Sequence, residues 1–497
     1  MSGTEEGSPS GEPGRHGLPE LIAERRAKAE RLRESDASAF PYAFPATEPI
    51  EGILAAYAHL VDGEETEDAH RVAGRLVARR GAGKAAFLDL VDRTGKIQLH
   101  ARVDVLGEES FERLTSLDVG DLIGVEGAPL RSRKGEISLR VDSFTVLAKA
   151  LRPPPDRHAG LSDVQTRYRR RELDLMASED ARKLFADRAR IISAVRAYLD
   201  EQGFIEVETP VLQPLYGGAL ARPFTTHHNA LGRDLYLRIA TELYLKRLIV
   251  GGLERVYELG KDFRNEGVSR KHNPEFTMVE WYEAYADYEN EAGRLEELAR
   301  QAAAAVDYAG ELDLQGRWRR VTFVEAIAEK TGIDVLEHRD VERLRAAVSR
   351  LDLDVQINGD TWFQLADDLL SKLVEPTLHQ PTFVMDYPVE LSPFAREHRS
   401  KPGLVERWEA FAAGVEIANA FSELIDPDAQ RERFEAQRRL ETLGEEEFQP
   451  YDELFLQALE QGMPPAGGVG VGIDRLVMVL TGRDSIREVV LFPAMRD

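Results

Sequence analysis

The spacing of hydrophobic and polar positions changes several times along the chain. Residues 1–17 are rich in Gly, Ser, Pro and Glu and hold no apolar run, which predicts a disordered tail. From Leu18 to about Ser35 the apolar positions have helical spacing within a charged sequence, and the prolines at 41 and 45 end that helix. From Arg71 to about Val146 the spacing becomes an alternation of period two, which is typical of strands with one buried face.

The alternating region contains five short runs with glycine-containing turns between them, RVAGRLVARR, AAFLDLVD, KIQLHARV, DLIGVEGAPL and EISLRVDSF. Five such strands within about 80 residues predict a small closed β-barrel such as an OB-fold. A proline-rich linker, ALRPPPDRHAGL, follows the barrel. Beyond Arg182 we expect one large domain of helices and strands that begins with the helix FADRARIISAVRAYLDEQGF.

Strand parity divides the side chains of the predicted barrel into an inward and an outward set. The inward set is apolar and comprises Leu88, Leu90, Ile97, Leu99, Ile137, Leu139 and Val141. Phe87, Gln98 and Glu136 fall on outward positions. An outward phenylalanine beside polar side chains suits a stacking platform for an unpaired base, although parity alone also allows Phe87 to pack under a loop or the N-terminal helix.

Composition excludes several classes of protein. The chain has 497 residues, enough for two or three domains, and 43% hydrophobic residues, enough for a large core. It has no cysteine, which excludes disulfides, thiolate metal sites and a cysteine nucleophile. No apolar stretch has the length of a membrane span, and the first residues hold no apolar signal core, so we expect a cytoplasmic protein.

The net charge of −24 is unevenly distributed. Residues 71–171 contain 20 Lys and Arg against 13 Asp and Glu, a net charge of +7, so the rest of the chain carries −31. A basic module on an acidic protein is what guided binding of nucleic acid requires. An arginine-rich protein that binds no nucleic acid could have the same composition, so charge leaves both interpretations open.

Three segments of the large domain concentrate chemically useful residues: GFIEVETPVLQP at 203–214, FRNEGVSRKHNPEFTMVEWYEAYADY at 263–288 and GVGVGIDRLVMVLTGRDSIREVVLFP at 468–493. In the second, an arginine that can hold a phosphate through two hydrogen bonds precedes an aromatic residue that can stack on a base. In the third, glycines without side chains would let a flat ligand lie on a strand. Taken singly, a salt-bridged surface hairpin and a tight strand–helix turn explain these segments equally well.

Together the three segments resemble the three signature motifs of class II aminoacyl-tRNA synthetases, in the order of that family. Longer stretches are similar to the bacterial lysyl-tRNA synthetases: GGALARPFTTHHNALGRDLYLRIATELYLKRLIVGGLERVYELGKDFRNEG, HNPEFTMVEWYEAYADY, YPVELSPFAR, EIANAFSEL and LFPAMR. The segment RRGAGKAAFLDLVDRTGKIQLHAR resembles the anticodon-binding OB domain of that family. The resemblance covers residues from about 19 to 497.

The resemblance implies an α+β multidomain protein, with an N-terminal OB-fold β-barrel and a class II synthetase catalytic domain on a mostly antiparallel sheet. The expected parts are a disordered tail at 1–17, an N-terminal helical segment at 18–60, the anticodon-binding barrel at 61–150, a linker at 151–180 and the catalytic domain at 181–497. It also implies activation of L-lysine with ATP and Mg²⁺, transfer to the 3′ end of tRNA(Lys), and a homodimer formed through the first motif, which contains Pro210.

Site residues follow from the resemblance position by position. It implies catalytic roles for Arg264 on the ATP α-phosphate and Arg475 on the far phosphate. The other implied ATP contacts are Glu266, His272 and Phe276, and the implied magnesium ligands are Glu409 and Glu416. The implied lysine-binding residues are Glu242 on the α-amino group and Glu280, Tyr282, Asn419, Phe421 and Glu423 around the side chain. The implied anticodon readers are Phe87, Gln98 and Glu136, which parity also places on the outside of the barrel.

The chemistry of lysine supports an acidic pocket independently. An ammonium group is strongly hydrated and is costly to bury unless it is paired, so carboxylates with neutral polar neighbours are needed. Asn419, Phe421 and Glu423 share one face of a predicted strand, whereas Glu416 is off that parity. Either a bulge lies near Ala418 or Glu416 serves the opposite side.

Glu409 and Glu416 flank a predicted turn at residues 412–414, and a tight hairpin would bring both carboxylates to one face. Two carboxylates together with ATP phosphates form a usual arrangement for magnesium.

The sequence departs from the family at four positions near the expected site. Thr241 stands where the family usually has proline, Ala418 and Ala420 where it has glycine, and Lys271 where it has arginine. Two added methyl groups could narrow the pocket, and lysine lacks the two-pronged hydrogen bonding of arginine. These departures put fine selectivity in doubt, but not the reaction class.

Three other functions share part of this sequence pattern. A sibling synthetase for aspartate or asparagine has the same domain plan, but anionic aspartate would need a basic pocket, whereas the matched residues are acidic. A lysine ligase that modifies a protein such as elongation factor P lacks the barrel. A catalytically silent RNA-binding paralogue is disfavoured by the retained Arg264, Glu409, Glu416 and Arg475.

Overall fold

The chain forms two compact units, residues 1–162 and 163–497, in a computed structural model. The structure describes residues 17–35, 40–45, 47–155, 161, 163–351, 353, 355–442 and 449–495. All of the tail expected at 1–17 except Gly17 lies outside these residues. Within the described part of the chain, no helix has the length and apolar character needed to cross a membrane.

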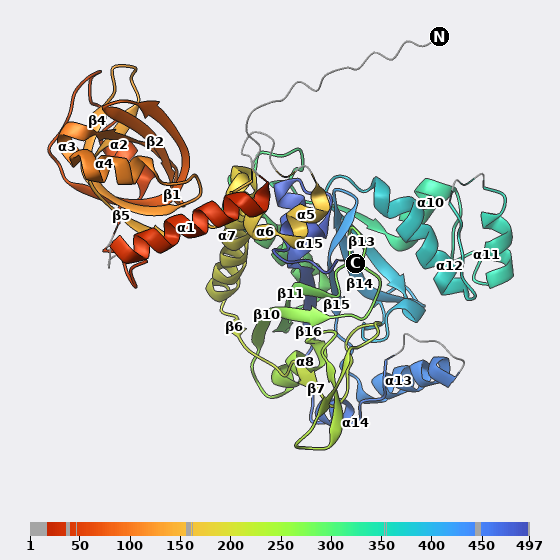
Figure 1. Cartoon of the computed structure of the whole chain (residues 1–497). Helices are drawn as coiled ribbons and strands as arrows, with labels where there is room; N and C mark the ends of the chain where they lie inside the picture. The colour runs from red at the N-terminus through yellow and green to blue at the C-terminus, as the bar shows by residue number, and fades with distance from the viewer. Residues whose placement is uncertain are drawn as a thin grey trace, which may run out of the picture. The chain divides into compact units, whose positions relative to one another are not determined.

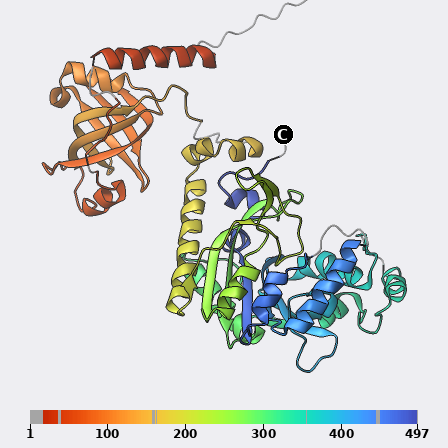
Figure 2. The ribbon, with the colours of Figure 1, turned by 90° about the horizontal axis from the view of Figure 1, so that it is seen from below.

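The first unit is a closed five-stranded barrel preceded by helices, as the alternation of its sequence predicts (Figure 2). The strands follow the order β1-β2-β3-β5-β4 around the barrel. The elements are α1 (Leu18–Ser35), α2 (Ile50–Ala56), β1 (His70–Ala82), β2 (Ala85–Val91), β3 (Lys96–Arg102), α3 (Val103–Leu106), α4 (Glu108–Thr115), β4 (Leu122–Arg131) and β5 (Ile137–Ala148). Six of the seven residues expected to point inward are buried, and Ile137 is only partly buried.

The second unit is built on an eight-stranded sheet in the order β12-β13-β14-β15-β16-β11-β10-β6 (Figure 1). Only the pairs β12–β13 and β6–β10 are parallel, so the sheet is mostly antiparallel, as expected. Its strands are β6 (Ile205–Glu206), β10 (Arg255–Phe263), β11 (Glu275–Ala284), β12 (Arg319–Thr322), β13 (Thr382–Pro388), β14 (Leu404–Ala412), β15 (Val415–Ser422) and β16 (Ala466–Gly472). A small separate sheet holds β7 (Leu212–Gln213), β8 (Thr225–His228) and β9 (Arg233–Leu237).

Helices and short turns complete the second unit. They are α5 (Val164–Arg169), α6 (Arg171–Ala177), α7 (Glu179–Glu201), α8 (Glu242–Val250), α9 (Tyr288–Ala304), α10 (Phe323–Thr331), α11 (Val341–Val348), α12 (Trp362–Leu369), η1 (Leu370–Val374), η2 (Glu375–Thr377), η3 (Val389–Leu391), α13 (Pro427–Thr442), α14 (Glu453–Leu459), α15 (Ile473–Thr481) and α16 (Ile486–Val489). Helices α5 and α6 occupy part of the stretch expected as a linker. Helices α10, α11 and α12 gather beside the β12–β13 edge of the sheet, at the right of Figure 1.

The two faces of the large sheet have different partners because its strands alternate. Trp281 of β11 and Trp408 of β14 are completely buried in a core that also contains residues of α7, α9 and α15. Phe411 of β14 instead belongs to a second core, with residues of α10, α11 and α12. The central strands therefore have one face in the α7–α9 core, which leaves their other face to line a cavity.

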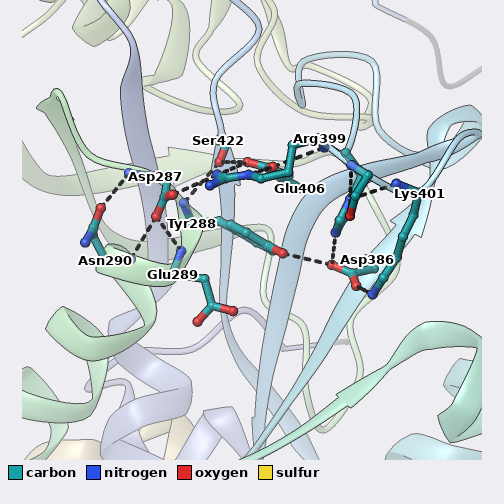
Figure 3. Close-up of polar contacts among 11 residues, drawn as sticks. Asp287, Tyr288, Glu289, Asn290, Asp386, Arg399, Lys401, Glu406 and Ser422 are labelled. Carbon is teal, nitrogen blue, oxygen red and sulfur yellow. Dashed lines mark hydrogen bonds and ion pairs between the residues drawn. The ribbon is translucent and has the colours of Figure 1, made fainter.

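A polar network joins the start of α9 to β13, β14 and β15 (Figure 3). Arg399 donates to Asp287, the N-cap of α9, over 2.7 Å, and also binds Glu406 of β14. The Ser422 hydroxyl donates to Glu406 over 2.6 Å, and the Tyr288 hydroxyl donates to Asp386 over 3.1 Å. These bonds hold the later part of the connection between β13 and β14, which contains Arg399. The earlier part of that connection, directly after β13, lines the cavity.

Candidate active site

A cavity of about 460 Å³ lies on the open face of the central strands of the second unit. It contains most of the site residues expected in this unit, which are Arg264, Glu266, His272, Phe276, Arg475, Glu242, Glu280, Tyr282, Asn419, Phe421, Glu409 and Glu416. Glu423 is the exception, because it is 1% exposed and lies behind the cavity wall. Residues far apart in the sequence are therefore gathered at one place.

Strand β11 forms one wall of the cavity with every second side chain. Phe276, Glu280 and Tyr282 face the cavity, while Val279 and Trp281 enter the α7–α9 core. Glu280 pairs in register with Gly470 of β16, and Tyr282 pairs with Gly468. A Cβ atom on Gly468 would lie 2.1 Å from Glu423 Oε1 and 2.3 Å from Tyr282 Cε1. Glycine is thus needed at 468 because pocket side chains occupy the space that a Cβ would fill.

The hairpin of β14 and β15 supplies another wall, and it contains a bulge. Glu409 pairs with Asn419 and Phe411 with Glu416, but the register shifts between Ala410 and Phe411. The shift leaves one extra residue, Ile417, in β15. Of the two arrangements that the sequence leaves open for Glu416, the bulge is therefore correct, and it places Glu416 on the same face as Glu409 and Asn419.

The two carboxylates of this hairpin already have charged neighbours. Glu409 accepts from Arg407 over 2.6 Å and from the Tyr387 hydroxyl over 2.8 Å, while Glu416 accepts from Arg475 over 2.8 Å. Burial raises the pKa of Glu409 to about 7, an effect that Arg407 opposes and Glu416 reinforces. A cation between the two carboxylates would relieve this unfavourable charge.

The residues fit a magnesium ion that takes only part of its coordination from protein. Across the residues that the structure describes, no cluster of three or more His, Cys, Asp or Glu is arranged to hold a metal. Mg²⁺ commonly binds one or two carboxylates and completes its shell with substrate phosphates and water. Glu409 and Glu416 form such a two-carboxylate set.

Two guanidinium groups bring positive charge into the same cavity. Arg264 lies over the Phe276 ring, 5.1 Å from its centroid, and its buried Nε has no hydrogen-bond partner among the described residues. Arg475 binds Glu416 and lies 3.3 Å from His272 Nε2. Burial, together with Arg475, lowers the pKa of His272. The cavity can therefore bind an anion beside an aromatic face.

The other part of the cavity is acidic and suits a cation. Burial raises the pKa of Glu280 to about 8, with further increases from Asp262 and Glu242, and Thr241 opposes the rise. Glu280 Oε2 has no hydrogen-bond partner in the described part of the chain. Burial also raises the pKa of Glu242. A buried ammonium would supply the partner that Glu280 Oε2 lacks.

Two charged residues of the site are absent from the sequence-based expectations. Arg407 bridges Glu409 and Asn419, and it lies two positions before Glu409, so strand parity could have identified it. Lys246 is buried against Glu242 at the helical spacing of four, which is also a recognisable signal. Its second contact, with Glu423, is tertiary and leaves no trace in local spacing.

The four departures from the family have separate structural settings. Lys271 donates to Glu375 over 2.6 Å and to the Gly414 carbonyl over 3.0 Å, so its charge is used locally. Ala418 and Ala420 are buried among the residues of the α7–α9 core, and Ala418 also lines the cavity. Thr241 is buried just before α8.

The outer face of the barrel in the first unit carries the other expected residues. Phe87 stacks on His100 with centroids 4.7 Å apart and an interplanar angle of 7°. Gln98 donates to Glu136 over 2.9 Å and accepts from the Ser138 hydroxyl over 3.2 Å. Gln98 is buried, with only 7% exposure, although its position on the outer face suggested an open side chain. Its neighbours on that face cover it, and they also fix which way its amide points.

Comparisons with known proteins match both units. Residues 163–496, more than half of the chain, match the family described as tRNA synthetases class II (D, K and N), and residues 70–147 match the OB-fold nucleic acid binding domain. The chain is 50% identical to a lysine–tRNA ligase of Moorella thermoacetica over 484 residues, which is 96% of this chain and 98% of that protein. It is 50% identical to a lysine–tRNA ligase of Chloroflexus aurantiacus over 489 residues, which is 97% and 99% of the two chains.

Proposed function

The chain belongs to the class II tRNA synthetases of the D, K and N group, and we propose that it is a lysine–tRNA ligase. It activates L-lysine with ATP to lysyl-adenylate and transfers the lysyl group to the 3′ end of tRNA(Lys), releasing pyrophosphate and AMP. The observation that carries this proposal is a single cavity with arginines at one part and buried, incompletely paired carboxyl groups at another.

The acidic part of the cavity favours lysine over the other substrates of the family. Glu280 and Glu242 line it, and both have a raised pKa because they are buried without enough positive charge. Glu280 would repel the side-chain carboxylate of aspartate, and the neutral side chain of asparagine would leave Glu280 unpaired. Tyr282 and Asn419 supply polar atoms that can fix the position of the ammonium group.

Activation requires positioning and charge stabilisation rather than a protein nucleophile. The lysine carboxylate attacks the α-phosphorus of ATP in line, and pyrophosphate leaves. Arg264, with its unpartnered Nε, stabilises the α-phosphate, and Arg475 binds the far phosphate. Phe276 and Glu266 frame the adenine, and His272 completes the ATP contacts. Mg²⁺ held by Glu409 and Glu416 supplies further stabilisation of phosphate charge when it is bound.

The barrel supplies recognition of the anticodon. The Phe87–His100 stack offers an aromatic surface on the outer face, which suits an unpaired base. Gln98 and Glu136 lie in one hydrogen-bonded chain and can read the edge of that base. The match of residues 70–147 to a nucleic acid binding domain supports this role. We assign residues 61–150 to the anticodon-binding domain and residues 181–497 to catalysis.

We further propose that the protein is a homodimer that acts in the cytoplasm, where its tRNA substrate is used. The first motif leaves apolar side chains exposed on β6, on β7 and directly before β7, namely Ile205, Leu212 and Val211. A second copy of the chain is the partner that this segment has in the resemblance described above. Light scattering in solution tests the stoichiometry, and a monomer at micromolar concentration would exclude the dimer.

ATP–pyrophosphate exchange with a panel of amino acids tests the proposed activity. Lysine alone should support rapid exchange, and the same preparation should charge tRNA(Lys). Exchange with aspartate or asparagine instead would identify a sibling enzyme. No exchange with any amino acid, together with retained tRNA binding, would indicate a silent RNA-binding paralogue.

A further inference from the structure

A lysine of the protein itself lies among the carboxylates of the lysine pocket. Lys246, on α8, is completely buried, and its Nζ lies 2.5 Å from Glu242 Oε1 and 2.5 Å from Glu423 Oε2. The same nitrogen lies 5.0 Å from the centroid of the Phe394 ring and 5.9 Å from that of Tyr282. Lys246 does not line the cavity, so its ammonium stands behind the wall rather than in the space for a ligand.

The position of Lys246 divides the carboxylates of the pocket into two kinds. Glu242 and Glu423 form ion pairs with its ammonium, whereas Glu280 forms no ion pair among the described residues, and its Oε2, like both oxygens of Glu423, has no hydrogen-bond partner there. When ionised, the three carboxylates carry three negative charges, of which Lys246 offsets one. The remaining two match the α-ammonium and side-chain ammonium groups of one lysine molecule.

We propose that Lys246 is a positioning residue for lysine recognition, which orients Glu242 and Glu423 and lowers the pocket charge to the value that the substrate's two ammonium groups offset. This inference rests on the proposed function, because only a substrate with two ammonium groups completes the balance. Lys246 acts through the carboxylates and does not touch the substrate.

The electrostatics around Lys246 agree with this role. Burial alone would lower its pKa, but Glu242 and Glu423 together raise the pKa above its ordinary value, so the ammonium stays charged. Burial raises the pKa of Glu423 to about 8, an effect that Lys246 opposes. The other charged or titratable groups that face the two carboxylates are Glu280, Tyr282, Glu291 and Arg407. Arg407 is engaged by Glu409, so it does not replace Lys246.

Removal of the ammonium should therefore act on lysine and on the pH profile. In Lys246→Met, which keeps an unbranched apolar stem but removes the ammonium, Glu242 and Glu423 retain their protons to higher pH. The KM for lysine in ATP–pyrophosphate exchange should rise at least about tenfold at neutral pH, with little change in the KM for ATP. The rise of kcat/KM for lysine with pH should move to higher pH. Lys246→Arg, which keeps the charge, should recover part of the loss.

A matched control is available on α7. Lys183 forms the same helical pair, with Asp187 at 2.5 Å, but its side chain is 68% exposed and lies outside the cavity. Lys183→Met should leave both KM values and the pH profile unchanged. It controls for the loss of a helical ion pair of identical spacing.

The double variant Lys246→Met/Glu423→Gln distinguishes charge balance from simple packing. It removes one charge of each sign, so the pocket returns to two net negative charges, and it should bind lysine more tightly than either single variant. The proposal is overturned if the double variant is no better than Lys246→Met, or if folded Lys246→Met loses activity without a shift in the pH profile. If Lys246→Met does not fold, the double variant is compared with Glu423→Gln, and the proposal is overturned if the double variant does not bind lysine more tightly than Glu423→Gln. If the unaltered protein fails to activate lysine at all, the proposed function itself is wrong.

Discussion

Replacement of Glu280 by glutamine tests the acidic part of the cavity most directly. Glu280 is 6% exposed and faces the cavity from β11, and one of its oxygens has no hydrogen-bond partner among the residues described. Glutamine has nearly the same shape but carries no charge. The substitution therefore removes the attraction for an ammonium group and changes little of the packing.

The size of the effect follows from two opposing contributions. Leaving one member of a buried charge pair without its partner costs about 3–5 kcal/mol. The unaltered protein must first ionise Glu280, whose pKa is about 8, and at about pH 7 this costs about 1.4 kcal/mol. The difference of roughly 1.6–3.6 kcal/mol predicts that Glu280→Gln lowers kcat/KM for lysine about 15- to 450-fold.

The pH dependence has a definite sign. An ammonium binds to the ionised carboxylate, and Glu280 becomes ionised as the pH rises through its pKa of about 8. In the unaltered protein, kcat/KM for lysine should therefore rise between about pH 6 and pH 8 and then level off. In Glu280→Gln, kcat/KM for lysine should rise less steeply with pH. The rise that remains comes from Glu423, whose pKa is also raised to about 8.

Initial rates of ATP–pyrophosphate exchange, with lysine and ATP varied separately, provide the measurement. The KM for ATP serves as the internal control because Glu280 lies in the acidic part of the cavity. An unchanged KM for lysine, or a pH profile that keeps its full slope in Glu280→Gln, would refute the reasoning. Equal losses for both substrates would indicate damage to the sheet.

Three further predictions concern other parts of the protein. Glu409→Ala and Glu416→Ala should each abolish adenylate formation at any Mg²⁺ concentration while the circular dichroism spectrum is retained; exchange activity in the double variant would place the ions elsewhere. Phe87→Ala should raise the KM for tRNA about tenfold or more and leave exchange unchanged, and unaltered charging kinetics would make Phe87 a packing residue. Burial raises the pKa of Glu291 to about 8 from 4.5, so its neutral form stabilises the fold at low pH and this stability is lost as the pH rises from 4.5 to 8. In Glu291→Gln, the free energy of unfolding, measured with urea at about pH 5 and pH 8, should differ less between the two pH values than in the unaltered protein. An equal difference in both proteins would contradict the prediction.

The pattern of apolar and polar residues predicts those strands and helices whose buried face is determined within the element itself. The alternation of period two identifies the barrel strands, because a side chain that faces the wrong way would expose an apolar group or bury a polar one. The same logic separates Phe276, Glu280 and Tyr282 from the core residues between them. Sequence resemblance supplies the remaining cavity residues, which lie on several strands.

Contacts between distant segments account for what the sequence does not predict. Parity leaves Gln98 on the outer face, but its burial depends on Ser138 of β5 and on Glu136, which directly precedes that strand. The second partner of Lys246 comes from a residue far along the chain. Strand parity does not decide whether a bulge forms at Ile417, because β15 keeps the same apolar pattern on its core side with or without an extra residue.

That bulge has a consequence for how the family can vary in length. Glu416 and Asn419 are three positions apart and yet face the same side, so both depend on the number of residues between them. An insertion or deletion of one residue between Ala418 and Phe421 would reverse one part of β15 relative to the other and turn either Glu416, the proposed cation ligand, or a cavity-lining residue away from the cavity. An insertion at the turn formed by residues 413 and 414 would leave Glu416 and Asn419 on the same face of β15. Natural length variation in this hairpin should therefore concentrate at the turn.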